Sequence, residues 1–219
     1  EYKIPYKDLN NSMGAFEYAN KQLQWSNSDP EDRFKAARNL AIVVRNVHKA
    51  GHAIGDFNDK NILLADEYVT LIDTDAFTIR AGDTIFKDTS YHPRYSPPKK
   101  REQSRSAVQR ADQFCLAVHI FQLLMEGFHP FQAVGSGAVN GDWPDLIQAN
   151  PFPYATSKDD IKPRESLNQK YKQLPVSIQE LFAKTFADGS KSHPWGRPTP
   201  MDWINAFGSL TSYSVDVET

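Results

Sequence analysis

The stretch Gly55-Asp56-Phe57-Asn58-Asp59-Lys60-Asn61, followed by Ile62-Leu63-Leu64 and then by Val69-Thr70-Leu71-Ile72-Asp73-Thr74-Asp75, decides how this chain is interpreted. The two apolar runs are separated by four residues and predict a small β-hairpin. The polar residues before and after the hairpin then lie at the ends of adjacent strands. Asp56, Asn61 and Asp73 are each ordinary turn formers when taken singly. Together they offer oxygen ligands of the kind that Mg²⁺ prefers.

Helical periodicity predicts most of the remaining structure. Ser28-Asp29-Pro30-Glu31 is a capping sequence that predicts a long helix, which ends at Gly51. A second long helix is apolar on almost all sides and is therefore expected to be buried at the centre of the fold. Its range and those of the other expected elements are as follows: the central helix at 108–126, helices at 9–23, 143–149 and 176–187, a helix opened by Thr199-Pro200-Met201-Asp202, and a weak strand pair within 77–86. The predicted fold class is mainly α, of the α+β type.

Composition excludes several classes of protein. The 219 residues carry 25 Lys and Arg against 27 Asp and Glu, which gives a net charge of −2 and no broad basic footprint for nucleic acid. The single cysteine, Cys115, cannot form an internal disulfide, and no apolar run is long enough to span a bilayer. The expected setting is the cytoplasm, without a nucleic-acid or membrane partner.

The spacing of the polar residues resembles a known signature. Asp56 and Asn61 are five residues apart, and Asp73 follows Asn61 by twelve residues, behind an apolar strand. This order is similar to the catalytic loop and metal-binding motif of the eukaryotic-like protein kinases. It most resembles divergent bacterial kinase domains with a Gly-Asp-x-Asn-x-x-Asn loop. Three later segments resemble the end of the activation segment, the central helix and a late Arg-Pro-Thr motif: Tyr95-Ser96-Pro97-Pro98-Lys99, Asp112-Gln113-Phe114-Cys115-Leu116-Ala117 and Arg197-Pro198-Thr199.

The resemblance implies transfer of the γ-phosphoryl group of ATP to a Ser or Thr hydroxyl of a protein. It implies that Asp56 orients the acceptor hydroxyl or accepts its proton, and that Asn61 and Asp73 hold Mg²⁺ on the ATP phosphates. Asn58 stands at the position of a catalytic lysine of the family. Lys60 is interpreted either as a substitute for that cation in contact with ATP or as a solvated surface lysine.

Two further residues are implied to support the site. Asp112 is expected to be buried at the start of the central helix and to bond backbone amides near Ile54 to Asp56, because an unpaired buried carboxylate is costly. Arg197 corresponds to the family arginine that closes an ion pair with the end of the activation segment. Lys99 stands where that pair has a glutamate, so Glu102 is the expected substitute.

Other family positions also differ. Ile54-Gly55 replaces the His-Arg pair before the catalytic Asp, which removes the cation that would hold a phosphate on the activation loop. Asp75 replaces the glycine of the metal motif and is either a further metal-side carboxylate or a polar turn residue. The run Lys99-Lys100-Arg101 is interpreted as a solvated face, with docking of an acidic partner as the alternative.

The resemblance also implies a domain organisation. Ile4-Pro5 resembles the hinge between kinase lobes, so residues 1–7 are interpreted as a hinge-like segment, 8–210 as the C-terminal lobe and 211–219 as a tail. Nothing from Glu1 to Gly51 resembles a Gly-rich phosphate loop or the lysine and glutamate of the smaller lobe. We therefore expect the chain to be a piece of a longer protein, with the N-terminal lobe of that protein as its partner beside ATP and a protein substrate.

Two other functions remain open at the level of sequence. Gly55-Asp56 also suits the His-Gly-Asp loop of aminoglycoside or choline kinases, although the later motifs favour a protein kinase. A pseudokinase or docking scaffold is the third hypothesis. The absence of lysine at Asn58 favours the scaffold, whereas retention of Asp56, Asn61 and Asp73 favours an enzyme.

Overall fold

Helix α3, Pro30–Lys49, begins where the capping sequence predicted. It belongs to a computed structural model that describes residues 13–14, 30–65, 68–81, 84–86, 92–98, 105–187 and 193–211. Pro30 supplies the fixed φ of a first helical residue, and Glu31 and Asp32 place negative charge at the positive end of the helix dipole. Gly51 follows the helix with a φ of 85°, the left-handed conformation that commonly ends a helix.

The predicted hairpin is present as strands β2, Ile62–Ala65, and β3, Tyr68–Leu71, paired antiparallel with Ile62 opposite Leu71. A third strand, β1, is Met13–Gly14, and it pairs antiparallel with β2 to give the sheet order β1-β2-β3. The predicted helix at 9–23 is therefore wrong at Met13 and Gly14, and its other residues lie outside the described ones. The weak strand pair is confirmed as β4, Ile79–Ala81, and β5, Thr84–Phe86.

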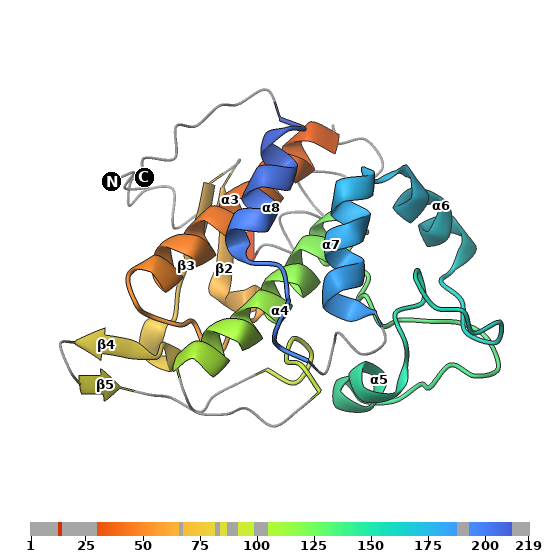
Figure 1. Cartoon of the computed structure of the whole chain (residues 1–219), viewed down its shortest axis with the longest axis horizontal. Coiled ribbons are helices and arrows are strands. Elements are labelled where there is room, and N and C mark those ends of the chain that lie inside the picture. The colour runs from red at the N-terminus through yellow and green to blue at the C-terminus, as the bar shows by residue number, and fades with distance from the viewer. Residues whose placement is uncertain are drawn as a thin grey trace.

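Helix α4, Arg105–Leu124, forms the centre of the fold, as predicted (Figure 1). Nearly every residue from Phe114 to Met125 is buried, because α3 and α7 pack on this helix. Helix α7 is Val176–Phe186 and α8 is Pro200–Gly208, and α8 lies along α3. The capping box predicted at the start of α8 is present, with reciprocal bonds between Thr199 and Asp202.

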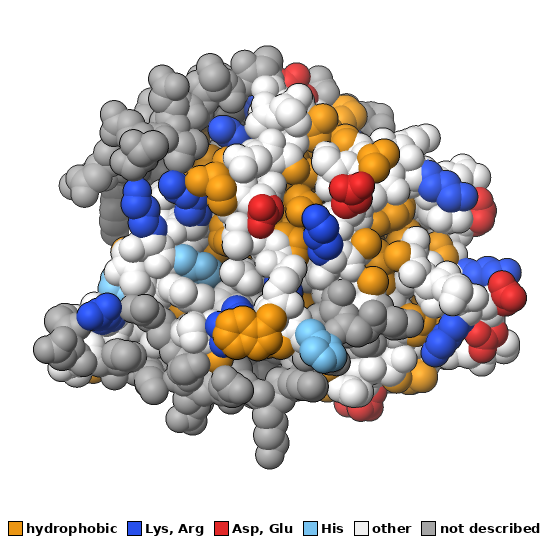
Figure 2. Space-filling model, viewed as in Figure 1, with side chains coloured by type: hydrophobic (Ala, Val, Ile, Leu, Met, Phe, Trp, Pro, Cys, Tyr) orange, Lys and Arg blue, Asp and Glu red, His pale blue; other side chains and the backbone are white. Residues whose placement is uncertain are grey.

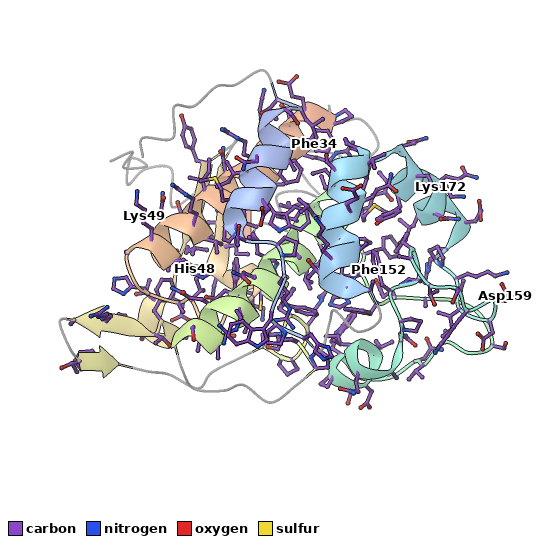
Figure 3. The ribbon with its side chains drawn as sticks, in the orientation of Figure 1. Phe34, His48, Lys49, Phe152, Asp159 and Lys172 are labelled. Atoms are coloured by element: carbon purple, nitrogen blue, oxygen red, sulfur yellow. The ribbon has the colours of Figure 1, made fainter. Side chains whose placement is uncertain are left out.

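A cluster of aromatic rings fills the space between α4, α7 and the loops that follow α4. Phe121 of α4 and Phe186 of α7 lie with ring centroids 6.4 Å apart, and the ring of Phe152 contacts both. Figure 3 labels Phe152 among the side chains below α7. Buried rings of this size dominate the energetics of a core. The cluster therefore fixes α4 as the rigid element on which the polar loops are held.

Two further helices lie at the far side of the molecule from the sheet (Figure 1). Helix α5 is Trp143–Ala149, as predicted, and α6 is Glu165–Gln173, where the sequence predicted no helix. Only Leu167 and Tyr171 of α6 are buried, so its apolar periodicity is too sparse to be noticed in the sequence. The architecture is nevertheless the predicted α+β one, helical with small antiparallel sheets.

The surface carries charges of both signs. On the face seen in Figure 2, Lys and Arg side chains alternate with Asp and Glu over α3, α7 and α8, and hydrophobic groups appear between them. Within the described ranges, we find no helix that combines the length and the apolar character needed to cross a bilayer. Cys115 is buried in α4 as a free thiol.

Candidate functional site

The loop from Gly55 to Asn61 folds back on its own backbone. The backbone amides of Phe57 and Asn58 donate to the carbonyl oxygens of Gly55 and Asp56, at 2.9 and 3.0 Å. The Asn61 side-chain amide also donates to the Asp56 carbonyl oxygen, at 3.1 Å. The five-residue spacing seen in the sequence thus brings Asn61 against the backbone of Asp56. This contact holds Asp56 in one orientation.

Asn58 is buried and caps the single 3₁₀ turn Asp59–Asn61. Its side-chain oxygen accepts from the backbone amide of Lys60 at 2.9 Å. The Lys60 side chain is exposed beside it. Asn58 therefore has a structural role in the loop, and Lys60 carries the positive charge of this turn.

Asp73 is brought to the same loop by the hairpin. The backbone amide of Ile72 donates to the carbonyl oxygen of Asn61 at 3.0 Å, and Asp73 is the residue that follows Ile72. Asp73 has φ 56° and ψ 63°, the left-handed region that costs about 1 kcal/mol or more for a residue with a side chain. This conformation ends the strand and opens the turn Thr74–Ala76, in which Asp75 is exposed.

The loop and the segment after Asp73 are also joined directly. Ala53 and Thr78 exchange two backbone hydrogen bonds, of 3.0 and 2.8 Å. Gly55, two residues after Ala53, has a φ of 85°, and a Cβ at Gly55 would come 2.2 Å from the carbonyl oxygen of Ala76. Only glycine fits this approach, which explains why an arginine cannot occupy the position in this backbone.

The three predicted oxygen donors are chemically suited to a hard cation. The Oδ1 atom of Asp56 is buried and has no hydrogen-bond partner among the described residues. The Asn61 side-chain nitrogen donates to the Asp56 carbonyl oxygen, which leaves the side-chain oxygen of Asn61 as the atom that could bind a cation. The Asp73 carboxylate is exposed and forms no capping bond. Among the described residues there is no group of three or more His, Cys, Asp or Glu side chains that could hold a metal ion.

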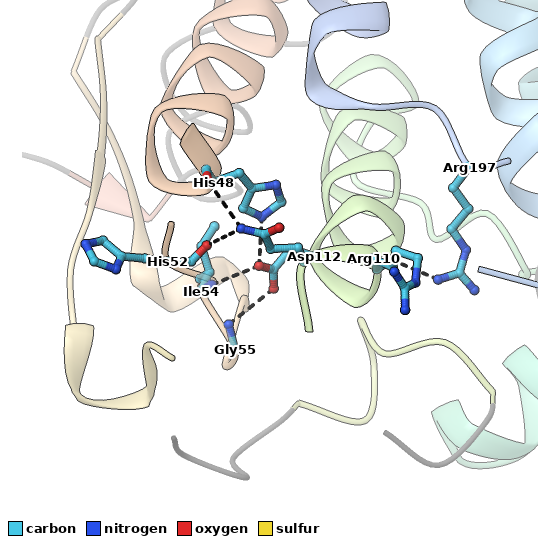
Figure 4. Close-up of polar contacts among 8 residues, drawn as sticks. His48, His52, Ile54, Gly55, Arg110, Asp112 and Arg197 are labelled. Carbon is cyan, nitrogen blue, oxygen red and sulfur yellow. Dashed lines mark hydrogen bonds and ion pairs between the residues drawn. The ribbon is translucent and has the colours of Figure 1, made fainter. Parts of the chain in front are cut away.

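Asp112 secures the loop from the central helix (Figure 4). Its carboxylate is fully buried and accepts the backbone amides of Ile54 and Gly55, at 2.8 and 3.2 Å. His48, near the end of α3, donates its Nε2–H to the same carboxylate at 3.0 Å. The contacts predicted for Asp112 are confirmed, and they place a full negative charge where three N–H groups converge.

Gln109 adds a second connection from the same helix. Its side-chain amide donates to the carbonyl oxygens of His48 and His52, at 3.3 and 2.7 Å. His52 in turn accepts the backbone amide of Arg80 from β4 on its Nδ1 atom, at 3.2 Å. Contacts from α4 and from β4 therefore hold His48 and His52, which connect α3 to the loop. Sequence reasoning missed His48 and Gln109, because their partners are more than fifty residues away.

The segment 92–98, which resembles the end of an activation segment, is held by two buried histidines. His119 donates from Nε2 to the Phe57 carbonyl oxygen at 3.1 Å, and its ring stacks on Tyr95 with centroids 4.4 Å apart. His129 bonds the Arg94 carbonyl oxygen at 2.8 Å. Burial lowers the pKa of His119 to about 4 and that of His129 to about 3, so both are neutral donors at pH 7.

Tyr95 is the other anchor of this segment. Its carbonyl oxygen accepts from the Cys115 thiol at 3.1 Å. Burial, followed by the negative charge of Asp59, raises the pKa of the Tyr95 phenol well above its usual value. Asp59 belongs to the loop that carries Asp56. Segment 92–98 is therefore packed against the loop through His119 and Tyr95.

Arg197 is buried against the start of α4. It donates from Nη1 to the carbonyl oxygen of Arg110 at 2.9 Å, and its guanidinium lies 5.2 Å from the centroid of the Phe114 ring. Burial lowers the pKa of Arg197 to about 10, so it remains charged at pH 7. The partner expected for an ion pair with Arg197, Glu102, lies outside the described residues.

Comparison with known proteins gives two relatives. The chain is 30% identical over 186 residues, or 80% of its length, to "Protein kinase YegI" of Escherichia coli strain K12, and it matches the protein of the same name from Escherichia coli O157:H7 equally. The chain spans 28% of the length of these relatives. No protein-family model matches it. The comparison supports a kinase-like relationship that extends across most of the chain.

Proposed function

We propose that this chain is the large lobe of a protein kinase, which transfers the γ-phosphoryl group of ATP to a Ser or Thr hydroxyl of a protein. The observation that carries the proposal is the set of hydrogen bonds that holds the loop of Asp56. Asp112 accepts two backbone amides of the loop, and the Asn61 side chain donates to the Asp56 carbonyl oxygen. Its support from sequence is the relationship to proteins named as kinases. A smaller lobe, as a partner that binds the other side of ATP, is part of the proposal.

In this proposal, Asp56 positions the acceptor hydroxyl. Its buried Oδ1 atom has no partner among the described residues and can accept the hydroxyl proton, while the hydrogen bonds of the loop hold its backbone still. Asn61 and Asp73 would hold Mg²⁺ through their side-chain oxygens. The metal ion would neutralise the charge of the ATP phosphates.

Lys60 is the proposed cation on the phosphate side. Asn58 occupies the position of the lysine of the family, but its side-chain oxygen is committed to the backbone amide of Lys60. The exposed Lys60 ammonium is two residues further along the same turn. A flexible ammonium can contact a phosphoryl oxygen without a fixed geometry.

Asn58 also favours one alternative, a docking scaffold without catalysis. A buried cap at this position stabilises the loop whether or not chemistry occurs. A second alternative, a small-molecule kinase, is favoured by the close contact of Gly55 with Ala76, because glycine precedes the catalytic Asp in that class as well. Acceptor identity separates the two kinase functions.

The test is phosphoryl transfer by the full-length product of the gene. We expect Mg²⁺-dependent transfer from ATP to Ser or Thr of an acceptor protein, and an Asp73→Ala variant should lose roughly a hundredfold or more of this activity while its unfolding curve is unchanged. Asp159→Ala is the matched control, since Asp159 is an exposed carboxylate at the edge of the molecule far from the sheet (Figure 3). Full activity in Asp73→Ala would refute the metal assignment, and absence of transfer to any protein would refute the proposed function.

A further inference from the structure

Arg94 is a cation at the surface of segment 92–98 without an anionic partner among the described residues. Its side chain is half-buried, and its Nε atom is buried with no hydrogen-bond partner among the residues that the structure describes. Nor does any ion pair in the described part of the chain include Arg94. A guanidinium has five N–H donors, and an unsatisfied buried donor costs about 1–3 kcal/mol. The two Nη groups of Arg94 are not among the buried atoms and form no hydrogen bond within the described residues, so they are available to an external acceptor.

Aromatic rings and a histidine hold this guanidinium in place. It lies 4.8 Å from the ring centroid of Trp143 in α5 and 5.6 Å from that of Tyr95. Its own carbonyl oxygen is bonded by His129, and His129 in turn packs on Trp143 with centroids 4.6 Å apart. Stacking on a ring face leaves the edge of the guanidinium open, and the edge is the part that binds a carboxylate with two hydrogen bonds.

The position of Arg94 is next to the candidate site. Tyr95, the following residue, stacks on His119, and His119 bonds the carbonyl oxygen of Phe57, the neighbour of Asp56. The pKa of His119 is lowered mainly by burial and is raised by the bond to Phe57. The charge of Asp59 also raises it and the charge of Arg94 lowers it, so both charges lie near this ring. Asp59 partly offsets the charge of Arg94, but no ion pair within the described residues joins them.

The sequence around Arg94 has the charge that an acidic partner requires. From His92 to Arg101 there are four basic residues, Arg94, Lys99, Lys100 and Arg101, and no acidic residue. The chain as a whole has a net charge of −2, so this stretch is a local exception. A basic stretch of sequence attracts acidic segments and disfavours basic ones.

We propose that Arg94, held close to the rings of Trp143 and Tyr95, binds a side-chain carboxylate of the acceptor protein and gives the site a preference for acidic segments. This inference rests on the proposed function, because it names the substrate class of the same site. The carboxylate accepts two N–H bonds from the open edge of the guanidinium. No covalent step is involved.

The test is the binding of labelled peptides to the full-length protein without ATP, followed by fluorescence anisotropy. The peptides share one central serine and differ only in their flanking residues, which are Glu, Gln or Lys. We expect the Glu peptide to bind best, and Arg94→Gln to weaken its binding roughly fivefold, with no change for the Gln peptide. Arg94→Lys should lose part of the same preference, because lysine keeps the charge but not the planar fork.

Arg164→Gln is the matched control. Arg164 also stacks on an aromatic ring, that of Phe128 at 5.4 Å, but it precedes α6 on the far side of the fold from the sheet (Figure 1). Its variant should bind all three peptides as the wild type does. Equal binding of the Glu and Gln peptides, or an unchanged preference in Arg94→Gln, overturns the inference.

Phosphoryl transfer to the same peptides separates this inference from the proposed function. Transfer to all three peptides at equal rates overturns the acidic preference and leaves the kinase proposal standing. Binding with the expected preference, but no transfer to any acceptor, overturns the kinase proposal and supports the carboxylate site at Arg94.

Discussion

Replacing Asp112 with asparagine is the most direct perturbation of the junction between helix and loop. The wild-type carboxylate is fully buried and accepts from Ile54, Gly55 and His48. Asparagine keeps the shape but turns one oxygen into an NH₂ group, which then faces an N–H donor. One charge-assisted bond, worth about 1.5–3 kcal/mol, is lost, and one buried donor is left unsatisfied at a cost of about 1–3 kcal/mol. Asparagine is neutral, so the cost of burying a charge no longer applies, and this gain offsets part of the lost stability.

We therefore expect Asp112→Asn to lower the free energy of unfolding by about 3 kcal/mol. Urea unfolding, monitored by circular dichroism, measures it as a midpoint shift of about 1–3 M with an unchanged slope. Hydrogen exchange should also accelerate at the amides of Ile54 and Gly55, because both donate to the carboxylate that the substitution weakens as an acceptor.

Asp202→Asn is the matched control for this prediction. Its carboxylate also accepts a backbone amide, that of Thr199 at 2.7 Å, but it is exposed at the start of α8. A cap of this kind is worth about 1 kcal/mol. If Asp112→Asn cost no more than Asp202→Asn, the argument that this buried carboxylate organises the loop would be refuted.

Two other substitutions and a pH series test the surroundings of the loop. Gly55→Ala should destabilise the fold by more than about 2 kcal/mol, because its Cβ would meet the Ala76 oxygen at 2.2 Å. Gly196 is the control, since it has a similar φ of 91° but no atom within 4 Å of an added Cβ. Gly196→Ala should therefore cost about 1 kcal/mol in the same urea assay. Equal costs would show that the close approach is unimportant. His119 and His129 have pKa values of about 4 and about 3 in the folded protein, below the ordinary 6.5. Their contribution to the free energy of unfolding is therefore complete above pH 6.5 and is lost as the pH falls toward the folded pKa values. Each histidine should lower the free energy of unfolding by about 2 kcal/mol between pH 6.5 and pH 5. A variant in which both histidines are replaced by phenylalanine, but which keeps the pH slope of the wild type, would contradict this.

Local signals predicted the long elements of the fold. The start of α3 follows from a capping sequence and a first-turn proline, and the start of α8 from the reciprocal bonds of Thr199 and Asp202. The hairpin β2–β3 follows from two apolar runs with a polar turn. These features depend on residues only a few positions apart, which is why a single sequence contains them.

The elements that the sequence did not predict depend on distant partners. Strand β1 is two residues long, and it is a strand because Met13 and Gly14 pair with β2 about fifty residues later. Helix α6 has a buried face of only Leu167 and Tyr171, so the packing partners decide its structure. Neither case has a strong local period, and tertiary context overrides weak local preference.

The candidate site divides in the same way. The contact of Asn61 with the Asp56 backbone spans five residues and follows from local spacing. The contact of Asp112 with Ile54 spans 58 residues, and it was expected only through the resemblance to kinases. The roles of His48 and His119 had no counterpart in the sequence reasoning. His119 is a buried donor and His48 a partly buried one, each with an acceptor in another segment, and no sequence period encodes such a pair.

The stability of this fold and the geometry of the candidate site are coupled, because the same groups serve both. The aromatic core fixes α4, and α4 carries Asp112 and His119, which bind the loop on both sides of Asp56 at Ile54 and Phe57. A substitution deep in α4 would therefore move the Asp56 carboxylate without touching it. Conversely, the exposed carboxylate of Asp73 bears no packing, so its removal isolates function from folding. This difference in burial is what makes Asp73→Ala a test of chemistry and Asp112→Asn a test of structure.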